Sequence, residues 1–356
     1  MTPIGLAGDP FSGARALTAP MMTCVAGRLW QTDGSFREGW LLHDGKIIVD
    51  SGEGRAPQPP VSVGDIIPAF VDAHTHVGDR ALRGAVDLQG RSLAEVVAPP
   101  DGLKHRLLRE TPGDRLLLGM RDALAELASG GAAWCADFRE QGVPGVAQLR
   151  RASEGMPTRP LVFGRCAGDW SDEEAAAVLR DADGIGLSGL GDVKGDVPER
   201  AAAAARAAGK RFALHLSEAE REDMPRALAL KPDFLVHGVA ATKEDLRAAA
   251  DARVPIVVCP RSNALFGRVP PVSNMLAAGV TVALGSDNAM FHPLGALREA
   301  ELLSSMLPRE ALLQMLVVNG RRALKLPEPT LARGWPAAFV VLQGWRAAHA
   351  HIPAPS

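Results

Sequence analysis

Short apolar runs alternate with longer amphipathic stretches over most of this chain. Between residues 66 and 286, runs rich in Val, Ile, Leu and Ala are separated by Ala-rich segments of helical length. Such alternation is typical of βα units that build a parallel sheet. The apolar runs expected to form strands are residues 66–76, 132–138, 160–166, 184–190, 211–216, 233–239, 254–260 and 280–286.

Eight βα units in about 260 residues predict the α/β class and, within it, a (β/α)8 barrel. The clearest helical stretches between the strands are residues 113–128, 173–181, 197–208 and 242–252. A doubly wound sheet is the alternative, but no strand here is followed by the glycine-rich phosphate loop found in nucleotide-binding examples of that fold. We therefore expect the TIM-like barrel.

The two ends of the chain have a different pattern. Between residues 23 and 65, short apolar segments are separated by Asp-Gly and Ser-Gly dipeptides, which favour hairpins. Residues 335–342 are strand-like again, after a helical stretch at 309–324. We expect residues 22–65 and 333–349 to form one small β-sandwich beside a barrel of residues 66–332. Residues 1–21 are expected to be a flexible leader, with Met21 or Met22 as an alternative start.

Composition narrows the class of protein. The 356 residues are 47% hydrophobic and 22% charged, with a net charge of −2, so no basic excess points to nucleic acid. No apolar stretch reaches the roughly 18–20 residues that span a bilayer. Four scattered cysteines without a C-x-x-C motif favour a reducing cytoplasm. The expected partner is a small molecule, and a homo-oligomer is compatible with the sequence.

Histidines and one aspartate stand at the ends of several expected strands. His74 and His76 end the first strand, His215 the fifth, His237 the sixth, and Asp287 follows the eighth. Residues two apart on a strand point the same way, and the carboxyl ends of barrel strands carry function. A single strand-end histidine is often only hydrogen-bonded, but this whole set indicates a metal site.

These residues lie in segments that resemble the amidohydrolase superfamily. The resemblance is to the branch of cytosine, guanine and S-adenosylhomocysteine deaminases and triazine hydrolases, and it covers about residues 22–345. It implies a barrel flanked by a β-sandwich. The matching segments are Pro68–His76, His215–Glu218, Val236–Gly238, Cys259–Asn263 and Leu284–Asn288.

The resemblance also implies a site. The implied ligands of one divalent metal ion are His74, His76, His215 and Asp287. Zinc is the first expectation, with iron or manganese as alternatives. The implied catalytic residues are Asp287 itself, His237 against the metal-bound water or substrate, and Glu218 as a proton shuttle. Taken alone, Glu218 could equally be a helix N-terminal acid favoured by the helix dipole.

The expected reaction is hydrolytic deamination of a nitrogen heterocycle, such as a purine, pyrimidine, pterin or nucleoside, by a metal-bound hydroxide. Amide, cyclic-amide or C–Cl hydrolysis on the same scaffold is the alternative. A second alternative is a barrel that binds a metal ion without catalysis.

A missing lysine favours one metal ion over two. Members of the superfamily with two metals bridge them through a carboxylated lysine at the end of the fourth strand. Residues 184–191 contain no lysine, and Lys194 comes later.

Substrate contacts are expected near the same strand ends. Arg139 and Glu140 follow the second strand and should reach the mouth of the barrel, unless Arg139 makes an ion pair at the rim. Asn263 follows the seventh strand, where it could also cap a turn, and His292 is a candidate for the pocket wall. Other candidates lie in the 78–112 loop, a possible lid: Arg80, Lys104 and His105. Out of context, His105 and three other histidines would be surface residues: His43, His349 and His351.

Overall fold

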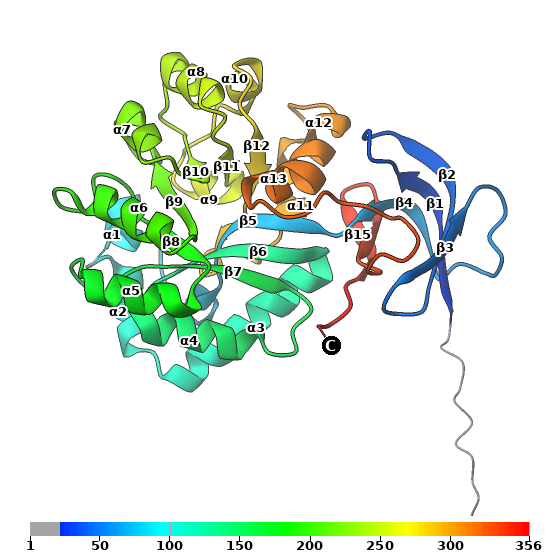
Figure 1. The fold of residues 1–356 in the computed structure, drawn as a ribbon, viewed down its shortest axis with the longest axis horizontal. Helices are drawn as coiled ribbons and strands as arrows, with labels where there is room; N and C mark the ends of the chain where they lie inside the picture. Colours follow the sequence, from blue (N-terminus) through cyan, green and yellow to red (C-terminus); the bar gives the residue numbers. More distant parts are fainter. Residues whose placement is uncertain (1–21, 100, 356) are drawn as a thin grey trace, which may run out of the picture.

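The computed structural model describes residues 22–99 and 101–355, and the expected leader, residues 1–21, lies outside them (Figure 1). A parallel sheet dominates the described chain, with the strand order β12-β11-β10-β9-β8-β7-β6-β5-β13. Its strands are β5 (Phe70–His76), β6 (Ala132–Arg139), β7 (Arg159–Gly164), β8 (Gly184–Leu187), β9 (Arg211–Leu216), β10 (Phe234–His237), β11 (Ile256–Val258), β12 (Val282–Leu284) and β13 (Asp287–Asn288).

The barrel is closed by a very short strand. After β12 the chain continues into β13, which pairs in parallel with β5, so that Asp287 lies opposite Thr75 and Asn288 opposite His76. The last βα unit therefore returns to the first strand, and the predicted (β/α)8 fold is confirmed. Closure also brings Asp287 next to the His74–His76 strand.

Alternating strand residues fill the barrel interior. One apolar cluster gathers the inward-facing side chains, and its largest side chains are three phenylalanines: Phe138, Phe163 and Phe234. Their ring centroids lie 5.3–6.1 Å apart. The interior is thus a packed core, with polar side chains only at the strand ends.

Helices cover the outside of the barrel (Figure 1). They are α3 (Gly113–Gly130), α4 (Gly142–Ser153), α5 (Asp172–Asp181), α6 (Val197–Ala207), α7 (Met224–Ala229), α8 (Lys243–Asp251), α10 (Val272–Ala277) and α11 (Ala296–Leu303). Helix α9 (Pro260–Leu265) starts directly after β11, at the carboxyl end of the barrel. Local signals start several of them: Ser171 and Thr242 cap α5 and α8 by accepting from backbone N–H groups. No helix in the described part of the chain is both long and apolar enough to cross a membrane.

The expected 309–324 helix is interrupted. It consists of α12 (Arg309–Leu313), a π-helical segment η2 (Gln314–Asn319) and α13 (Gly320–Ala323). Asn319 accounts for part of this geometry, since its side-chain amide donates to the Val282 carbonyl at the barrel wall.

Residues 77–99 and 101–112, here called the cap, form a set of short helices beside the barrel. It contains η1 (Val77–Leu82), α1 (Leu93–Val97) and α2 (Leu103–Glu110). A small core of its own includes Leu82, Val96 and Leu108, which pack with Met290 from the loop after β13. The cap is therefore attached to the same loop that follows Asp287.

Strands from both ends of the chain form a second sheet, as expected. Its order is β15 (Arg346–His351), β14 (Phe339–Gln343), β4 (Ser62–Pro68), β1 (Thr23–Trp30), β2 (Phe36–His43) and β3 (Ile48–Gly52). Among the described residues this is one continuous six-stranded sheet, and a bridge between Ile47 and Pro336 links its two ends.

The apolar run at 66–76 serves both sheets rather than forming one strand. β4 ends at Pro68 in the second sheet, and β5 begins at Phe70 in the barrel. Between them, the Ala69 N–H donates to Ala338 and the Phe70 N–H donates to Gly131. A continuous apolar pattern cannot reveal this change of partner, because both strands are buried.

Candidate metal centre

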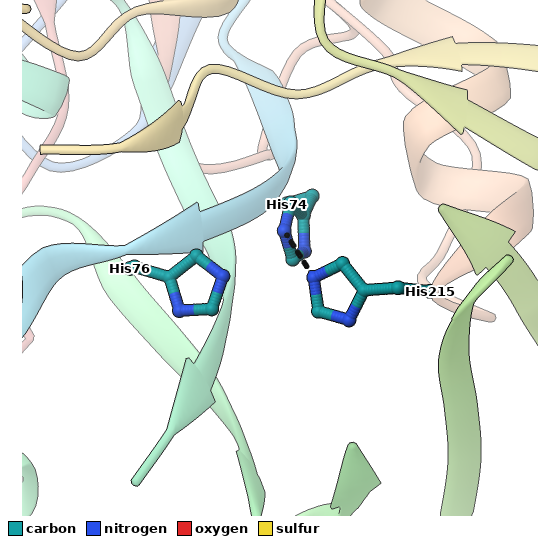
Figure 2. A group of neighbouring side chains, drawn as sticks. All are labelled: His74, His76 and His215. Atoms are coloured by element: carbon teal, nitrogen blue, oxygen red, sulfur yellow. Dashed lines mark hydrogen bonds between the residues drawn. The ribbon is translucent and has the colours of Figure 1, made fainter. Parts of the chain in front are cut away.

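Three imidazoles converge at the carboxyl end of the barrel (Figure 2). His74 and His76 come from β5, and His215 comes from β9 across the barrel. The Nε2 atoms of His74 and His215 lie 3.2 Å apart. Asp287 adds a carboxylate: its Oδ1 lies 3.3 Å from the His74 Nε2 and 3.6 Å from the His76 Nε2. All four expected ligands are therefore brought together.

The donor set fits a tetrahedral divalent ion. Zinc–nitrogen bonds of about 2.0–2.1 Å place tetrahedral ligand atoms about 3.4 Å apart, close to the separations here. Carbonyl oxygens face the other ring nitrogens of two histidines: Phe138 O is 3.1 Å from the His76 Nδ1, and Leu187 O is 2.8 Å from the His215 Nδ1. An Nδ1–H that donates to each carbonyl leaves the Nε2 lone pair facing the shared space. Three neutral imidazoles and a carboxylate are suitable ligands for zinc.

Backbone geometry brings Asp287 to this position. Its φ of 59° lies in the left-handed region, which is uncommon for a residue other than glycine. Two neighbours hold it: Ser262 donates its hydroxyl to the Asp287 Oδ2, and the preceding residue, Ser286, is bonded to the buried Asp72 through its N–H and its hydroxyl. Strained backbone that is held this firmly is characteristic of functional sites.

Glu218, His237 and Asn263 form a second group beside the four donors. The His237 Nε2 lies 3.4 Å from the Glu218 Oε1, and the Asn263 amide nitrogen lies 3.4 Å from that oxygen and 3.3 Å from the His237 Nδ1. Asn263 therefore bridges the two, rather than only capping a turn. His237 also has a positive φ, 76°.

A carboxylate outside this group shapes the turn that carries Glu218. Ser217 has a φ of 53°, and its N–H donates to the Glu222 Oε2. The other Glu222 oxygen accepts from the N–H groups of Leu190 and Gly191. Glu222 thus joins the loops after β8 and β9, and it fixes the chain immediately before Glu218.

The titratable side chains of the site differ in their expected charge states. Burial lowers the pKa of His74 to about 3 and that of His237 to about 4. Burial opposes ionisation of Asp287, but its hydrogen bond and charge interaction with His74 outweigh this and hold its pKa well below the usual range. Burial, reinforced by the Asp287 charge, raises the pKa of Glu218 to about 8. Neutral imidazoles, an ionised aspartate and a protonated glutamic acid therefore coexist near neutral pH.

Comparison with known proteins identifies the family. The amidohydrolase family pattern matches residues 66–354, most of the chain. This protein belongs to the amidohydrolase family. Its hydrolase class, expected from the sequence, follows from that membership, and the expected superfamily is confirmed.

Relatives and solved structures agree with this assignment. A putative aminohydrolase of Methanothermobacter thermautotrophicus is 33% identical over 289 residues, which is 74% of each chain. A 5-methylthioadenosine/S-adenosylhomocysteine deaminase of Halobacterium salinarum is 29% identical, over 80% of this chain and 77% of its own. The zinc complex of the atrazine chlorohydrolase TrzN from Arthrobacter aurescens has the same fold, with a TM-score of 0.69 at 19% identity over 89% of this chain and 86% of its own.

A cavity of about 1340 Å³ lies beside the candidate metal centre, although none of the four expected ligands lines it. Its wall includes Glu140, which lies 3.3 Å from the His76 Nδ1, and Leu187, whose carbonyl faces His215. His105 and Arg165 also line it. Two of the expected substrate-contact candidates, Glu140 and His105, are therefore on the cavity wall.

Arg139 corrects an expectation. Its side chain is 1% exposed and is absent from the cavity wall, so it does not reach the mouth of the barrel. Instead its guanidinium lies 2.6 Å from the Glu140 Oε2. The prediction was wrong because β6 extends to Arg139, whose side chain lies among buried carboxylates.

The histidines outside the site were only partly predicted. His43 and His105 are buried, not on the surface: His43 packs against Phe339, and the His105 Nε2 faces the Val97 carbonyl. His349 and His351 are half-buried in the second sheet. The His292 Nδ1 lies 3.3 Å from the Pro293 carbonyl, and burial lowers the pKa of His292 to about 4. Lys194 is exposed beyond β8.

Proposed function

We propose that this amidohydrolase holds one divalent ion, zinc in the first place, through His74, His76, His215 and Asp287. The separations between their donor atoms and the two carbonyl-oriented imidazoles support this proposal. A divalent ion bound there supplies the acidity that makes water a nucleophile near neutral pH. One ion, rather than two, is supported by the absence of a lysine at the end of β8.

We propose hydrolytic deamination of a nitrogen heterocycle as the reaction. The observation that carries it is the half-buried Glu218 carboxyl, whose pKa is raised to about 8 by burial, beside His237. Deamination needs a proton delivered to a ring nitrogen and another to departing ammonia. A protonated carboxylic acid can give the first, and the carboxylate left behind can take a proton from the attacking water and pass it to the amino group. The Halobacterium relative, which is named a deaminase, supports the same reaction class.

The neighbouring residues have distinct parts in this proposal. Asn263 donates toward the Glu218 oxygen and so holds the carboxyl on the side of His237. His237, neutral because burial lowers its pKa to about 4, can orient the attacking water or the substrate by hydrogen bonding. The cavity beside Glu140 provides room for the heterocycle and its substituents.

Ammonia release tests the proposed reaction. Zinc-loaded protein would be incubated with amino-purines, amino-pyrimidines, pterins and nucleosides, and ammonia would be measured. E218Q should lower the rate by about 10²–10⁴-fold, the usual contribution of a general acid–base group. E220Q is the matched control, because Glu220 is exposed two residues further on.

The test also separates the alternatives. A fall below about tenfold in E218Q would argue against proton shuttling by Glu218. Chloride or a carboxylic acid as the product, in place of ammonia, would identify C–Cl or amide hydrolysis instead. Bound zinc without turnover of any substrate would favour the non-catalytic barrel.

We also propose a cytoplasmic location. The four cysteines are buried and unpaired in the described structure, as expected in a reducing compartment.

A further inference from the structure

A lysine ammonium from the cap lies among buried carboxylates beside the proposed zinc centre. Lys104 is on α2, and its side chain is only 4% exposed. Its Nζ lies 2.9 Å from the Asp79 Oδ2, 2.8 Å from the Glu140 Oε1 and 3.4 Å from the His76 Nδ1. These four residues are called the Lys104 pocket below.

Without the lysine, the Lys104 pocket would have the composition of a metal site. His76, Asp79 and Glu140 each present a ligand atom, and these three atoms lie within 4.8 Å of one another. The carboxylate side chains of Asp79 and Glu140 are 0% and 5% exposed. Buried carboxylates at this distance require a compensating cation, since water cannot reach them.

The neighbouring arginines do not replace the ammonium. Arg139 binds the opposite oxygen of Glu140, at 2.6 Å, and lies 3.8 Å from Asp137 and 4.0 Å from Asp79. Arg165 is 3.7 Å from the Glu140 Oε1. The fully buried part of this group therefore holds two cations, Lys104 and Arg139, against three carboxylates. Loss of the ammonium would leave a strongly anionic pocket.

We propose that Lys104 is the resident cation of a second cation site, and that its ammonium keeps a second metal ion out of the Lys104 pocket. This inference rests on the proposed function only in placing the pocket beside a zinc centre. The two sites differ in chemistry: the centre is rich in imidazole, whereas Asp79 and Glu140 offer oxygen ligands, which suit Mn²⁺ better. His76 can keep its Nδ1 toward the Phe138 carbonyl, 3.1 Å away, while the carboxylates bind the ion.

The proposal connects the cap to the number of metal ions. Lys104 is placed in the pocket by α2, which packs through Leu108 against Leu82 and Met290. The docked cap therefore fills the second cation site with the Lys104 ammonium instead of a metal ion.

Manganese binding to zinc-loaded protein tests the proposal. K104M keeps the aliphatic stem but removes the charge, and free Mn²⁺ would be followed by electron paramagnetic resonance. We expect K104M to bind one additional Mn²⁺ about 10–100-fold more tightly than the wild type, the range over which groups near a metal usually change its affinity. The double variant K104M/E140Q should lose this gain, because one carboxylate is removed.

Two control variants accompany this test. One keeps a positive charge at position 104, and the other removes a lysine charge from a different part of the protein. K104R retains a cation in the pocket and should not gain the Mn²⁺ site. K325A removes an exposed lysine from its ion pair with Asp233, which exposes a single carboxylate and should also give no gain.

Defined outcomes would overturn the inference. These are equal Mn²⁺ binding by K104M and the wild type, a gain that persists in K104M/E140Q, or a second ion already bound by the wild type. If K104M is unstable, a rise in its melting temperature with Mn²⁺ supports the proposal, and a chain that stays unfolded in millimolar Mn²⁺ overturns it. Zinc content and ammonia release of the wild type, measured separately, show whether the proposed function itself has failed.

Discussion

The Nε2 atoms of His74 and His215 lie 3.2 Å apart, although 141 positions separate the two residues in the chain. Two neutral imidazole nitrogens at this distance must share a proton or a cation, because their lone pairs otherwise repel each other. With the Asp287 carboxylate 3.3 Å from the same His74 atom, a divalent cation satisfies all three. The contact between these two rings therefore marks the centre of the proposed metal site.

Removal of one imidazole should abolish tight metal binding. In H215A we expect zinc affinity to fall by more than about a hundredfold, beyond the range for residues outside the ligand shell. Zinc content after dialysis against a chelator measures this directly. H349A is the control, since His349 lies in the second sheet; equal zinc loss in both variants would contradict the ligand assignment.

Asn263 should affect turnover but not metal content. N263A removes the amide that lies 3.4 Å from Glu218 and 3.3 Å from His237, so both groups lose an orienting partner. We expect kcat for ammonia release to fall by about 10–100-fold, with zinc binding unchanged, as for other groups that orient a site. A decrease in zinc content equal to the loss of activity would refute this role.

Gly285 should not tolerate a side chain. A Cβ at this position would lie 2.7 Å from the His74 Cβ and 2.8 Å from its backbone nitrogen, so β5 or the chain before Asp287 would have to move. G285A is expected to lower both thermal stability and zinc affinity. G130A is the matched control, because nothing lies within 4 Å of a Cβ there; similar behaviour of the two variants would disprove the argument.

The pH dependence of stability should report on Glu218. Burial raises its pKa from the model-compound value of 4.5 to about 8 in the folded chain. The folded state therefore holds the proton more tightly, and the resulting stabilisation is present below pH 4.5 and is lost as pH rises toward 8. Urea unfolding of metal-free protein should show a steeper loss of stability across this window in the wild type than in E218Q. Parallel pH profiles would show that the Glu218 pKa is not raised.

The aromatic core should be important for stability. Phe163 is fully buried and stacks on Phe138, whose ring also contacts His74 with the centroids 4.6 Å apart. F163A is expected to cost about 3–5 kcal/mol in the free energy of unfolding, as for other large-to-small changes of buried phenylalanine. Denaturant titration measures this cost, and a value below about 1 kcal/mol would mean that the core refills the space.

Strand-end residues were the predictable part of the site. His74, His76, His215 and Asp287 each follow an apolar run, and parallel strands bring such positions to one edge, so their meeting could be inferred without coordinates. The fold was also predictable, because the alternation of apolar strand segments with helical segments is recognisable even when the predicted strand ends are off by a few residues. Asn263 was also identified, although only the structure shows that it contacts both Glu218 and His237.

The buried charges could not be predicted in the same way. Lys104 and Asp79 come from α2 and η1 of the cap, Glu140 directly follows β6, and no spacing in the sequence connects the three. Glu140 and Lys104 were expected only as substrate contacts and Asp79 was not singled out, because tertiary packing, which removes water from these charges, cannot be read from the sequence. The sequence also did not show that the chain passes from the second sheet to the barrel sheet at Ala69, because β4 and β5 on either side of it are both apolar and buried there.

The short β13 strand has a consequence for how this protein matures. Asp287 lies on the strand that closes the barrel against β5. During synthesis, His74 and His76 leave the ribosome first, His215 follows, and the carboxylate is added only when nearly all of the barrel has been made. A nascent chain therefore offers an incomplete set of the proposed donors, and under the proposed ligand set the metal ion can gain its last ligand only when the barrel closes.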